Sequence, residues 1–422
     1  MNPIIKSCPN CAQPYPSHEG YTDWCEACNW NVKEHRQTVY NESTYATFVN
    51  KLGDRFSKQL YEQVKTIQDV KPKPSWLTFF TLAVASGVFL SWVMFIVLDV
   101  WLLTKLPNMF AILGCILCSL IVVTFRPRFN LPPDTFFTQA EAPILFGIIE
   151  DLRLKLGASK IDYLVIDQKF NASMGYTGFR RKRVLTLGYP LLFVLDAQET
   201  VELISHELAH DVNRDPSRGY MQWYAFESLW RWYKVTYPVE IITTDAGLYG
   251  VLLSIPFNLA MWCISQVFLG CAYLLSWLLW RDSQRAEYYA DYLAITMSGT
   301  KSSESSFRKL HYRNFLELAV QQSVVHRKEN DVFDLFREAI DSIPPREIER
   351  IQRVNLLYNS KVDSSHPPTA YRIGFVQSRG ILEPGYVLTN ERHTQLLQEL
   401  SKFQKSIAQK LIDEFKDMIY TV

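Results

Sequence analysis

The feature that most constrains this chain is a set of long stretches that carry no charged side chain. Residues 75–98 are uncharged, and only Asp99 interrupts the apolar run before Leu103. Residues 106–125 and 246–280 are two further uncharged runs. A helix of roughly 20 apolar residues crosses the hydrocarbon of a bilayer. The sequence therefore predicts a membrane protein, and the charged stretches between the runs predict sizeable water-facing parts.

The first two runs are typical of a transmembrane helical hairpin, because the connection around Lys105 is very short. Basic residues flank its outer ends: Lys71 and Lys73 precede it, and Arg126 and Arg128 follow it. Cytoplasmic loops of membrane proteins carry an excess of lysine and arginine. We therefore expect both ends of the hairpin to face the cytoplasm, most simply from the inner (plasma) membrane of a cell.

Four cysteines form two C-x-x-C pairs in a polar N-terminal segment, which lacks the apolar core of a secretory signal: Cys8, Cys11, Cys25 and Cys28. Two tight turns that each offer two thiolates suit tetrahedral zinc. We therefore expect a zinc ribbon with one structural zinc ion, which supplies much of its folding free energy. A pair of disulfides or a redox motif is the alternative interpretation. The other cysteines lie in apolar runs, where cysteine behaves as a small hydrophobic residue.

The charge of the chain gives no sign of a nucleic-acid partner. The 44 lysines and arginines are balanced by 43 aspartates and glutamates. Within the cysteine-containing segment, Lys6 is the only lysine or arginine before Lys33. Binding to phosphates depends on clustered lysine and arginine. We therefore expect no nucleic-acid partner, and a ribbon that docks on protein.

Outside the apolar runs, the residue pattern predicts mostly helices with a small β-sheet. Two stretches rich in β-branched and aromatic residues, Ile161–Asp167 and Arg183–Leu187, are typical of strands. Asp196 and Glu199 have the spacing of a capping box and predict the start of a helix. Ser302–Ser306 is expected to be a loop. Further helices are expected over 43–69, 139–156 (ending at Gly157), 282–298, after Pro344-Pro345, and in one long final helix from about Asn390.

The helix that follows Asp196 carries the motif His206-Glu207-Leu208-Ala209-His210. Positions i and i+4 of a helix share a face, so both imidazoles can bind one metal ion. Glu207 follows the first of them and can reach a metal-bound water. Two ordinary surface histidines on a helix are the alternative, which the amphipathic context disfavours.

A catalytic zinc site needs a third protein ligand and an open position for water. Glu287 and Asp291 lie one turn apart on the expected 282–298 helix. Glu287 can complete a His-His-Glu set, and Asp291 can accept the second N–H of a ligating histidine. Further along, His366 or Arg372 can stabilise the oxyanion of a tetrahedral intermediate.

These pieces, in this order, resemble the integral-membrane gluzincins, which include the HtpX-type heat-shock protease and the CAAX prenyl protease. The resemblance spans roughly 135–380, and its matching segments are Asn171-Ala172, His206–His210, Glu287–Asp291 and His366-Pro367 with Arg372. It implies a membrane-bound zinc endopeptidase with zinc on His206, His210 and Glu287 and with Glu207 as general base. It also places Asn171 and Ala172 on an edge strand near the substrate. The N-terminal ribbon departs from the commonest family pattern.

The predicted fold is a mostly helical, zincin-like metalloprotease domain with a small β-sheet, fused to transmembrane helices and a zinc ribbon. The expected divisions are a ribbon (1–32), a helical linker (33–74), a transmembrane hairpin (75–128), a first protease part with the zinc motif (129–215), an aromatic interfacial segment with a second membrane hairpin (216–280) and a second protease part (281–422).

The two protease parts must converge on one metal, which restricts the path between them. His206 and Glu287 can meet only if the chain between them crosses the membrane an even number of times. As one helix, residues 246–280 would extend about 50 Å, more than a bilayer needs. We therefore expect a break near Asn258, which would make a short hairpin or a non-crossing helix pair.

The favoured function is hydrolysis of peptide bonds in membrane or misfolded proteins, at an active site facing the cytoplasm. One catalytic and one structural zinc are expected. The partners are protein substrates and the lipid bilayer. The alternative is a catalytically silent membrane adaptor that uses the ribbon to bind proteins, and the complete metal set with Glu207 argues against it.

Overall fold

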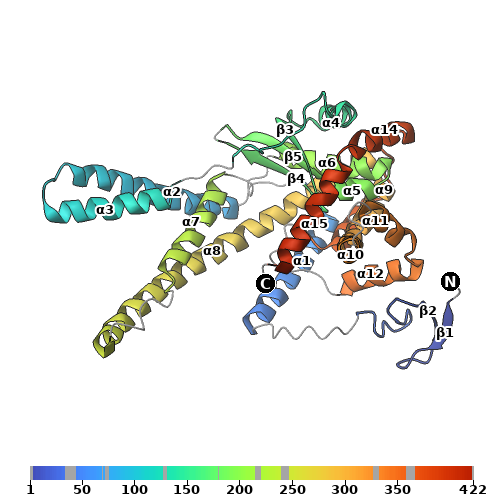
Figure 1. The fold of residues 1–422 in the computed structure, drawn as a ribbon, viewed down its shortest axis with the longest axis horizontal. Helices are drawn as coiled ribbons and strands as arrows, with labels where there is room; N and C mark the ends of the chain where they lie inside the picture. Colours follow the sequence, from blue (N-terminus) through green and yellow to red (C-terminus); the bar gives the residue numbers. More distant parts are fainter. Residues whose placement is uncertain are drawn as a thin grey trace. The chain divides into compact units, whose positions relative to one another are not determined.

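The computed structural model describes residues 3–33, 44–68, 70–71, 76–126, 131–178, 180–213, 220–238, 247–326, 332–357 and 366–420. The chain divides into two compact units. The first comprises residues 1–70, 131–213 and 287–422, and the second comprises residues 71–130 and 214–286. Helices dominate and the sheets are small, which confirms the predicted fold class (Figure 1).

The second unit contains the expected pair of apolar helices, α2 (Trp76–Leu103) and α3 (Met109–Thr124). The side chain of Asn108 caps α3 by accepting hydrogen bonds from the backbone N–H groups of residues 110 and 111. The two helices lie side by side, and the Trp92 indole N–H of α2 donates to the Val122 carbonyl of α3 at 3.1 Å. Asp99, the lone charge of the run, accepts a hydrogen bond from the Ser119 hydroxyl at 2.8 Å.

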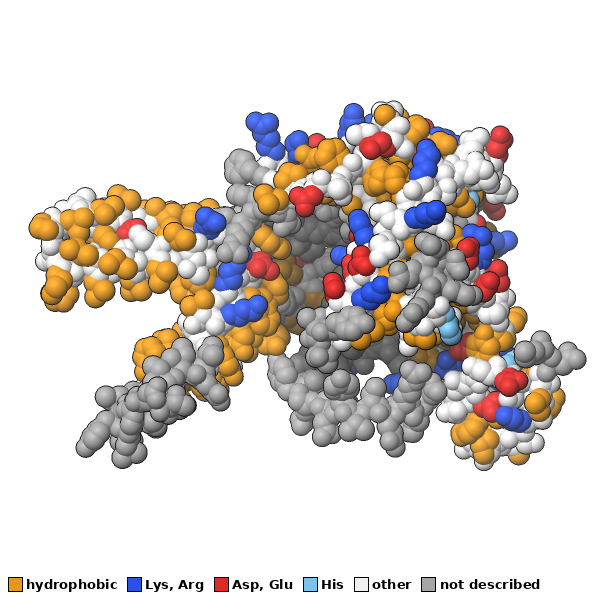
Figure 2. Space-filling model, in the orientation of Figure 1, with side chains coloured by type: hydrophobic (Ala, Val, Ile, Leu, Met, Phe, Trp, Pro, Cys, Tyr) orange, Lys and Arg blue, Asp and Glu red, His pale blue; other side chains and the backbone are white. Residues whose placement is uncertain are grey.

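The outward faces of this hairpin are apolar, as Figure 2 shows for α2 and α3. Large exposed side chains on these helices include Phe79, Leu90, Met94, Val97, Trp101, Leu113, Ile116 and Leu120. Among the residues that the structure describes, two helices are long and apolar enough to cross a bilayer: Thr78–Leu103 within α2, and Ile255–Ser298 within α8. Apolar faces of this kind are stable against lipid rather than water.

Helix α8 (Gly247–Ser298) corrects the expected path between the protease parts. It runs for 52 residues without interruption, so the predicted break near Asn258 is absent, and Pro256 lies inside the helix. A separate helix, α7 (Tyr220–Thr236), precedes it and lies beside it. Two successive helices, α7 and α8, therefore follow the first protease part along the chain, in place of the expected hairpin within 246–280.

Helix α7 uses much of its aromatic content for packing between helices of the second unit. The Trp232 ring stacks on Phe125 with 3.8 Å between ring centroids, and it also stacks on Phe268 of α8 at 5.4 Å. The small residues Ala225 of α7 and Ala272 of α8 are fully buried at the same contact. Small side chains let helix backbones approach closely in apolar surroundings.

The first unit contains a three-stranded sheet with the order β3-β5-β4: β3 is Tyr163–Asp167, β5 is Lys182–Gly188 and β4 is Ala172–Thr177. The central strand β5 pairs parallel with β3 and antiparallel with β4. Leu185 and Leu187 of β5 are fully buried, as alternation toward one core predicts. The residue pattern did not predict β4, which is an edge strand of this sheet.

Helix α4 (Pro143–Leu156) covers the core beside the sheet, and it ends as predicted at Gly157, whose φ is +71°. Its N-terminus has no cap of its own side chains. The buried carboxylate of Glu399 accepts the N–H groups of Ile144 and Leu145 instead, at 2.9 and 3.0 Å. A distant helix therefore supplies the cap that the local sequence lacks.

Helix α6 (Ala197–Asn213) carries the zinc motif, and it begins with the predicted capping box. The Glu199 N–H donates to the Asp196 carboxylate at 2.8 Å, and the Asp196 N–H donates back to the Glu199 carboxylate at 2.7 Å. Lys309 also pairs with Glu199, at 2.6 Å. Almost every residue of α6 from 197 to 211 is buried, so the helix forms the centre of the unit.

The remaining helices of the first unit surround this centre: α1 (Thr44–Thr66), α5 (Tyr189–Val194), α9 (Thr300–Lys309), α10 (Arg313–Val325), α11 (Val332–Asp341), α12 (Pro345–Leu357), α13 (Thr369–Ser378), α14 (Asn390–Ser401) and α15 (Gln404–Tyr420). Two expectations were wrong. The final helix is two helices, α14 and α15, and Ser302–Ser306 lies within α9 rather than in a loop. Ser303 and Ser306 are buried with their hydroxyls hydrogen-bonded, so tertiary packing overrides a weak local preference for helix.

The N-terminal segment forms a small two-stranded antiparallel sheet of β1 (Ile4–Ser7) and β2 (Pro14–Ser17). Trp24 is fully buried against α12. Its ring lies under the guanidinium groups of Arg346 and Arg353, 4.6 and 5.0 Å from its centroid. Arg350 and Arg353 donate to the carbonyls of Val32 and Glu26 respectively. The arginines thus fasten the ribbon to one face of α12.

Candidate active site

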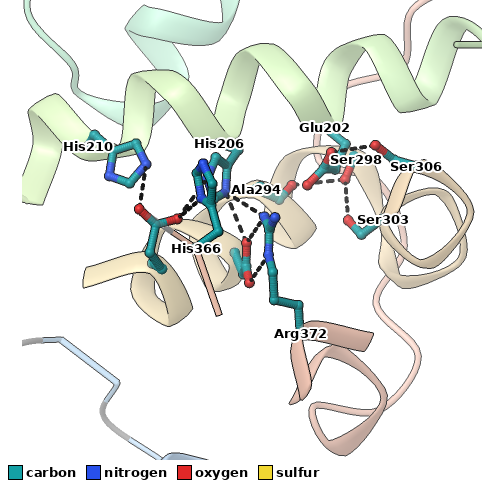
Figure 3. Close-up of polar contacts among 11 residues, drawn as sticks. Glu202, His206, His210, Ala294, Ser298, Ser303, Ser306, His366 and Arg372 are labelled. Atoms are coloured by element: carbon teal, nitrogen blue, oxygen red, sulfur yellow. Dashed lines mark hydrogen bonds and ion pairs between the residues drawn. The ribbon is translucent and has the colours of Figure 1, made fainter. Parts of the chain in front are cut away.

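Helix α6 places His206 and His210 one turn apart on a single buried face. The two rings have centroids 4.9 Å apart and stand perpendicular to each other. Their exposed fractions are 3% and 1%, and Glu207 between them is 3% exposed. Figure 3 shows both imidazoles projecting from α6 toward the same region. The geometry is that of two ligands that share one metal ion.

Helix α8 brings Glu287 to the same place. One carboxylate oxygen of Glu287 lies 3.3 Å from Nε2 of His206, and the other lies 3.6 Å from Nε2 of His210. His206 and Glu287, which are far apart in the sequence, therefore lie close together in the folded chain.

These three groups fit zinc. Nitrogen and oxygen ligands lie about 2.0–2.2 Å from zinc, so two ligand atoms of a tetrahedral site are about 3.3–3.6 Å apart. The two distances to Glu287 fall in this range. Among the described residues, Nε2 of His206 and one carboxylate oxygen of Glu207 are buried without a hydrogen-bond partner, which leaves their lone pairs directed into the site.

Asp291 and Arg372 support His206 from its other ring nitrogen. Nδ1 of His206 lies 2.9 Å from Asp291, which orients Nε2 toward the metal position. The Arg372 guanidinium pairs with both oxygens of Asp291, at 3.0 and 2.6 Å, and lies 3.3 Å from Nδ1 of His206. Burial and Arg372 lower the pKa of His206, but Asp291 and Glu287 outweigh them and raise it to about 10. The two carboxylates therefore favour a positive charge at this imidazole.

His366 and Arg372 lie on different sides of the site. His366, in the loop before α13, places Nδ1 2.6 Å from a Glu287 oxygen and keeps 29% of its side chain exposed. Arg372 is 5% exposed and faces the Nδ1 side of His206, away from the metal position at Nε2. Of the two residues that the sequence suggested for the oxyanion, His366 has the more exposed side chain.

Asn171 and Ala172 lie at the start of the edge strand β4. Ala172 is buried and pairs with Leu187 of β5, while Asn171 is exposed and its carbonyl accepts the Gly188 N–H at 2.8 Å. Strand β4 is tied to the zinc helix, because the Tyr176 hydroxyl donates to Asp211 of α6 at 3.2 Å. Strand β4 is therefore held against the helix that carries the motif.

The four N-terminal thiols also gather at one point. Sγ of Cys8 lies 3.7 Å from Sγ of Cys28, and Sγ of Cys11 lies 3.6 Å from Sγ of Cys25. Thiolates about 2.3 Å from a tetrahedral zinc are separated by about 3.8 Å, whereas a disulfide bond is about 2.05 Å long. The spacing fits a four-cysteine zinc site, and none of the four forms a disulfide.

Sequence reasoning missed Glu202, which belongs to the same buried cluster. It lies one turn before His206 on α6 and is 2% exposed. Burial raises the pKa of its carboxyl to about 7. Its position on the buried face, four residues before a metal-ligating histidine, is the signal that could have identified it.

Comparisons with known proteins agree with this geometry. The model of peptidase family M48 matches residues 146–380, which include His206, Glu207, His210, Glu287, Asp291, His366 and Arg372 but not the four N-terminal cysteines. The chain is 26% identical over 240 residues to a protease HtpX homolog of Pyrobaculum calidifontis, which covers 56% of this chain and 67% of the relative. A protease HtpX homolog of Pyrobaculum aerophilum is 24% identical over the same shares. No solved structure matches. With a family match over more than half its length, the chain belongs to peptidase family M48 and is a membrane-associated zinc metallopeptidase.

Proposed function

We propose that this chain is a membrane-bound endopeptidase in which His206, His210 and Glu287 hold the catalytic zinc and Glu207 is the general base. The observation that carries the proposal is the convergence of Glu287 on the two imidazoles at 3.3 and 3.6 Å. Zinc in such a site supplies Lewis acidity and lowers the pKa of a bound water to about 7.

Side chains of the protein transfer the proton, stabilise the oxyanion and position the zinc ligand. The buried Glu207 carboxylate takes a proton from the attacking water and delivers it to the leaving amine. His366, on the exposed side of Glu287, donates a hydrogen bond to the developing oxyanion. Arg372 acts as a positioning residue, because it holds Asp291 against Nδ1 of His206.

The substrate binds as an extended strand along β4, next to Asn171 and Ala172. An edge strand offers unpaired backbone N–H and C=O groups that recognise any extended polypeptide. Recognition through the backbone tolerates many side chains, which suits a protease of membrane or misfolded proteins.

The cysteine cluster holds a second, structural zinc, and the ribbon is a module for docking on protein. Lys71 and Arg126 flank the apolar hairpin and favour a cytoplasmic location for both its ends, with ribbon and active site on that side of the inner membrane. A catalytically silent adaptor is not favoured, because His206, His210, Glu287 and Glu207 are all present in the sequence.

The decisive experiment replaces Glu207 by Gln in full-length protein purified in detergent. We expect the rate of cleavage of a fluorescent unfolded protein to fall roughly 10²–10⁴-fold while zinc content stays at two per chain. Glu317→Gln, at an exposed glutamate, is the control and should cleave normally. Cleavage by Glu207→Gln at the wild-type rate would refute the proposal.

A further inference from the structure

A cleft of about 930 Å³ lies between the ribbon and the helices of the first unit that pack near it. Among the described residues that line this cleft, none belongs to the candidate active site. Ligand sites in proteins usually have volumes of about 300–1,000 Å³. Residues 20–23 of the ribbon form one wall. The opposite wall is formed mainly by two helices: α10 contributes Phe315, Leu318 and Gln322, and α11 contributes Leu335, Glu338 and Ala339.

The helical wall presents apolar side chains to the cleft. The lining residues of α10 are spaced by three and four positions, and so they lie on one face of the helix. Leu318 on this face keeps 43% of its surface exposed, and Phe315 is only half-buried. Leu335 of α11 is half-buried as well. Exposed apolar groups inside a cleft are typical of a binding site for a ligand that has apolar groups of its own.

Contacts between the two walls hold the cleft in its shape. The Tyr21 hydroxyl of the ribbon donates to the Ser342 carbonyl, just after α11, at 3.2 Å. Arg350 of α12 donates to the Val32 carbonyl of the ribbon at 2.9 Å. A site that is formed before binding loses less conformational entropy when its ligand arrives. The cleft is therefore preorganised for a ligand.

The charges of the lining favour a cationic ligand. Glu347 of α12 pairs with Arg350 at 2.7 Å. Asp23 of the ribbon pairs with Lys6, also at 2.7 Å. Glu338 is exposed, and it forms no ion pair within the part of the chain that the structure describes. A carboxylate next to apolar side chains complements a segment that carries lysine or arginine, and it disfavours nucleic acid and other anions.

The polar groups of the lining suit a polypeptide backbone. Gln322 of α10 carries an amide, and Thr22 of the ribbon carries a hydroxyl. Both groups can donate and accept hydrogen bonds. An extended backbone offers N–H and C=O groups in turn, which need partners of both kinds. Apolar contacts, a carboxylate and such groups together match a segment of polypeptide.

We propose that this cleft is a recruitment site for protein substrates, where an extended segment with lysine or arginine beside an apolar side chain binds. Polypeptides are the ligands that a member of a peptidase family meets. Glu338 attracts the basic side chain, Leu318 contacts the apolar one, and Gln322 bonds the backbone. The recruitment role rests on the proposed function, whereas binding of the segment does not depend on hydrolysis.

The first test measures peptide binding to full-length protein in detergent, with Glu207→Gln as the background so that the probe is not cleaved. The probe is a short unstructured peptide of leucine, glycine and lysine, labelled with fluorescein. A second peptide carries glutamate in place of each lysine. We expect fluorescence anisotropy to show about tenfold tighter binding of the lysine peptide. Equal affinities for the two peptides would overturn the proposal.

Two matched pairs of variants locate the binding. Glu338→Lys reverses a charge inside the cleft, and Asp334→Lys makes the same change at an exposed residue one turn earlier in α11, outside the lining. Leu318→Ser and Val325→Ser each remove an exposed apolar side chain from α10, but only Leu318 lines the cleft. All four positions are exposed, so the variants should fold.

The cleft variants Glu338→Lys and Leu318→Ser should each raise the Kd of the lysine peptide roughly 3–10-fold. The two control variants should leave it within about twofold of the background protein. Unchanged affinity in both cleft variants would overturn the proposal. Equal losses in Glu338→Lys and Asp334→Lys would also overturn it, because binding would then depend only on overall charge.

A cleavage assay in the wild-type background tests recruitment itself, with an unfolded protein rich in lysine as the substrate. Glu338→Lys should raise KM roughly 3–10-fold and leave kcat unchanged, because the cleft binds substrate without touching the reacting atoms. An unchanged KM would overturn the recruitment role. Wild-type protein that binds the lysine peptide but cleaves no protein would instead refute the proposed function.

Discussion

Asp291 holds Nδ1 of His206 at 2.9 Å while Glu287, one helical turn away on α8, approaches Nε2 of the same ring at 3.3 Å. One helix thus contacts both nitrogens of one imidazole. Replacing Asp291 by Asn removes the charge that orients the ring, and we expect zinc affinity and kcat each to fall about 10–100-fold. Zinc content after dialysis against a weak chelator measures the first effect. Asp282→Asn, on the same helix but bonded to Thr78, should retain its zinc.

The Arg353 guanidinium should hold the ribbon on α12. It covers Trp24 and donates to the Glu26 carbonyl at 2.6 Å, so Arg353→Ala removes both contacts. We expect hydrogen exchange over residues 24–32 to be about 5–30-fold faster, because the two contacts together contribute about 1–2 kcal/mol. Arg313→Ala, which breaks an exposed ion pair with Glu317, should leave exchange there unchanged. Equal exchange in both variants would show that Arg353 does not hold the ribbon.

Removal of one thiol should unfold the ribbon without emptying the catalytic site. Cys28→Ser leaves three thiolates, and a domain with so small a core depends on its metal for folding. We expect zinc content to fall from two ions per chain to one, with rapid exchange throughout residues 4–32. Retention of two zinc ions by Cys28→Ser would contradict a four-cysteine site.

The Asp211 carboxylate should stabilise the folded protein at neutral pH, and it should lose this effect in strong acid. Burial raises the pKa of its carboxyl, but the hydrogen bonds from Arg183 and Ser159 outweigh burial and lower the pKa below the ordinary 3.8. A carboxyl whose pKa is lowered by folding stabilises the folded state when the pH is above its pKa in the unfolded chain. This stabilisation disappears as the pH falls through its pKa in the folded state. Asp211→Asn should therefore cost about 2 kcal/mol near pH 7, and the difference from the wild type should shrink below pH 3.8. Thermal unfolding of both proteins from neutral pH to below pH 3.8 measures this difference in stability. A difference that does not change with pH would contradict the prediction.

Gly188 should tolerate no side chain. A Cβ at this position would lie 1.8 Å from the Lys169 carbonyl oxygen and 2.6 Å from that of Asn171, both backbone atoms. Gly188→Ala must therefore push the start of β4 away from β5, and we expect a loss of at least 1–3 kcal/mol, estimated roughly from overpacked cores. Gly175→Ala, in β4 with nothing within 4 Å, is the control. Equal melting temperatures for the two variants would contradict the close approach.

Several elements could be predicted because a local signal determines them. The capping box of Asp196 and Glu199 and the left-handed stop at Gly157 depend on neighbours in the sequence. The convergence of His206, His210 and Glu287 followed from the chemistry of zinc, which needs three ligands wherever the chain supplies them.

Other features depend on partners that the local sequence does not contain. The apolar run 246–280 is compatible with one helix or with two. In the structure it forms part of one helix, α8, which packs against α7. The serines of α9 disfavour helix locally, yet Ser306 is helical and donates to the buried Glu202, which is far away in the sequence. The position of Glu202 four residues before His206 places it on the same face of α6, but the sequence does not show which groups it meets there.

The ribbon packs on α12, a helix that is synthesised long after the ribbon itself. The ribbon's four cysteines leave the ribosome long before Arg346 and Arg353, the residues that cover Trp24. Until those two arginines have been synthesised, the Trp24 indole lacks the cover that α12 gives it in the folded protein. The ribbon can therefore reach its final packing only after α12 has been made, because Arg350 and Arg353 of α12 bond its backbone carbonyls.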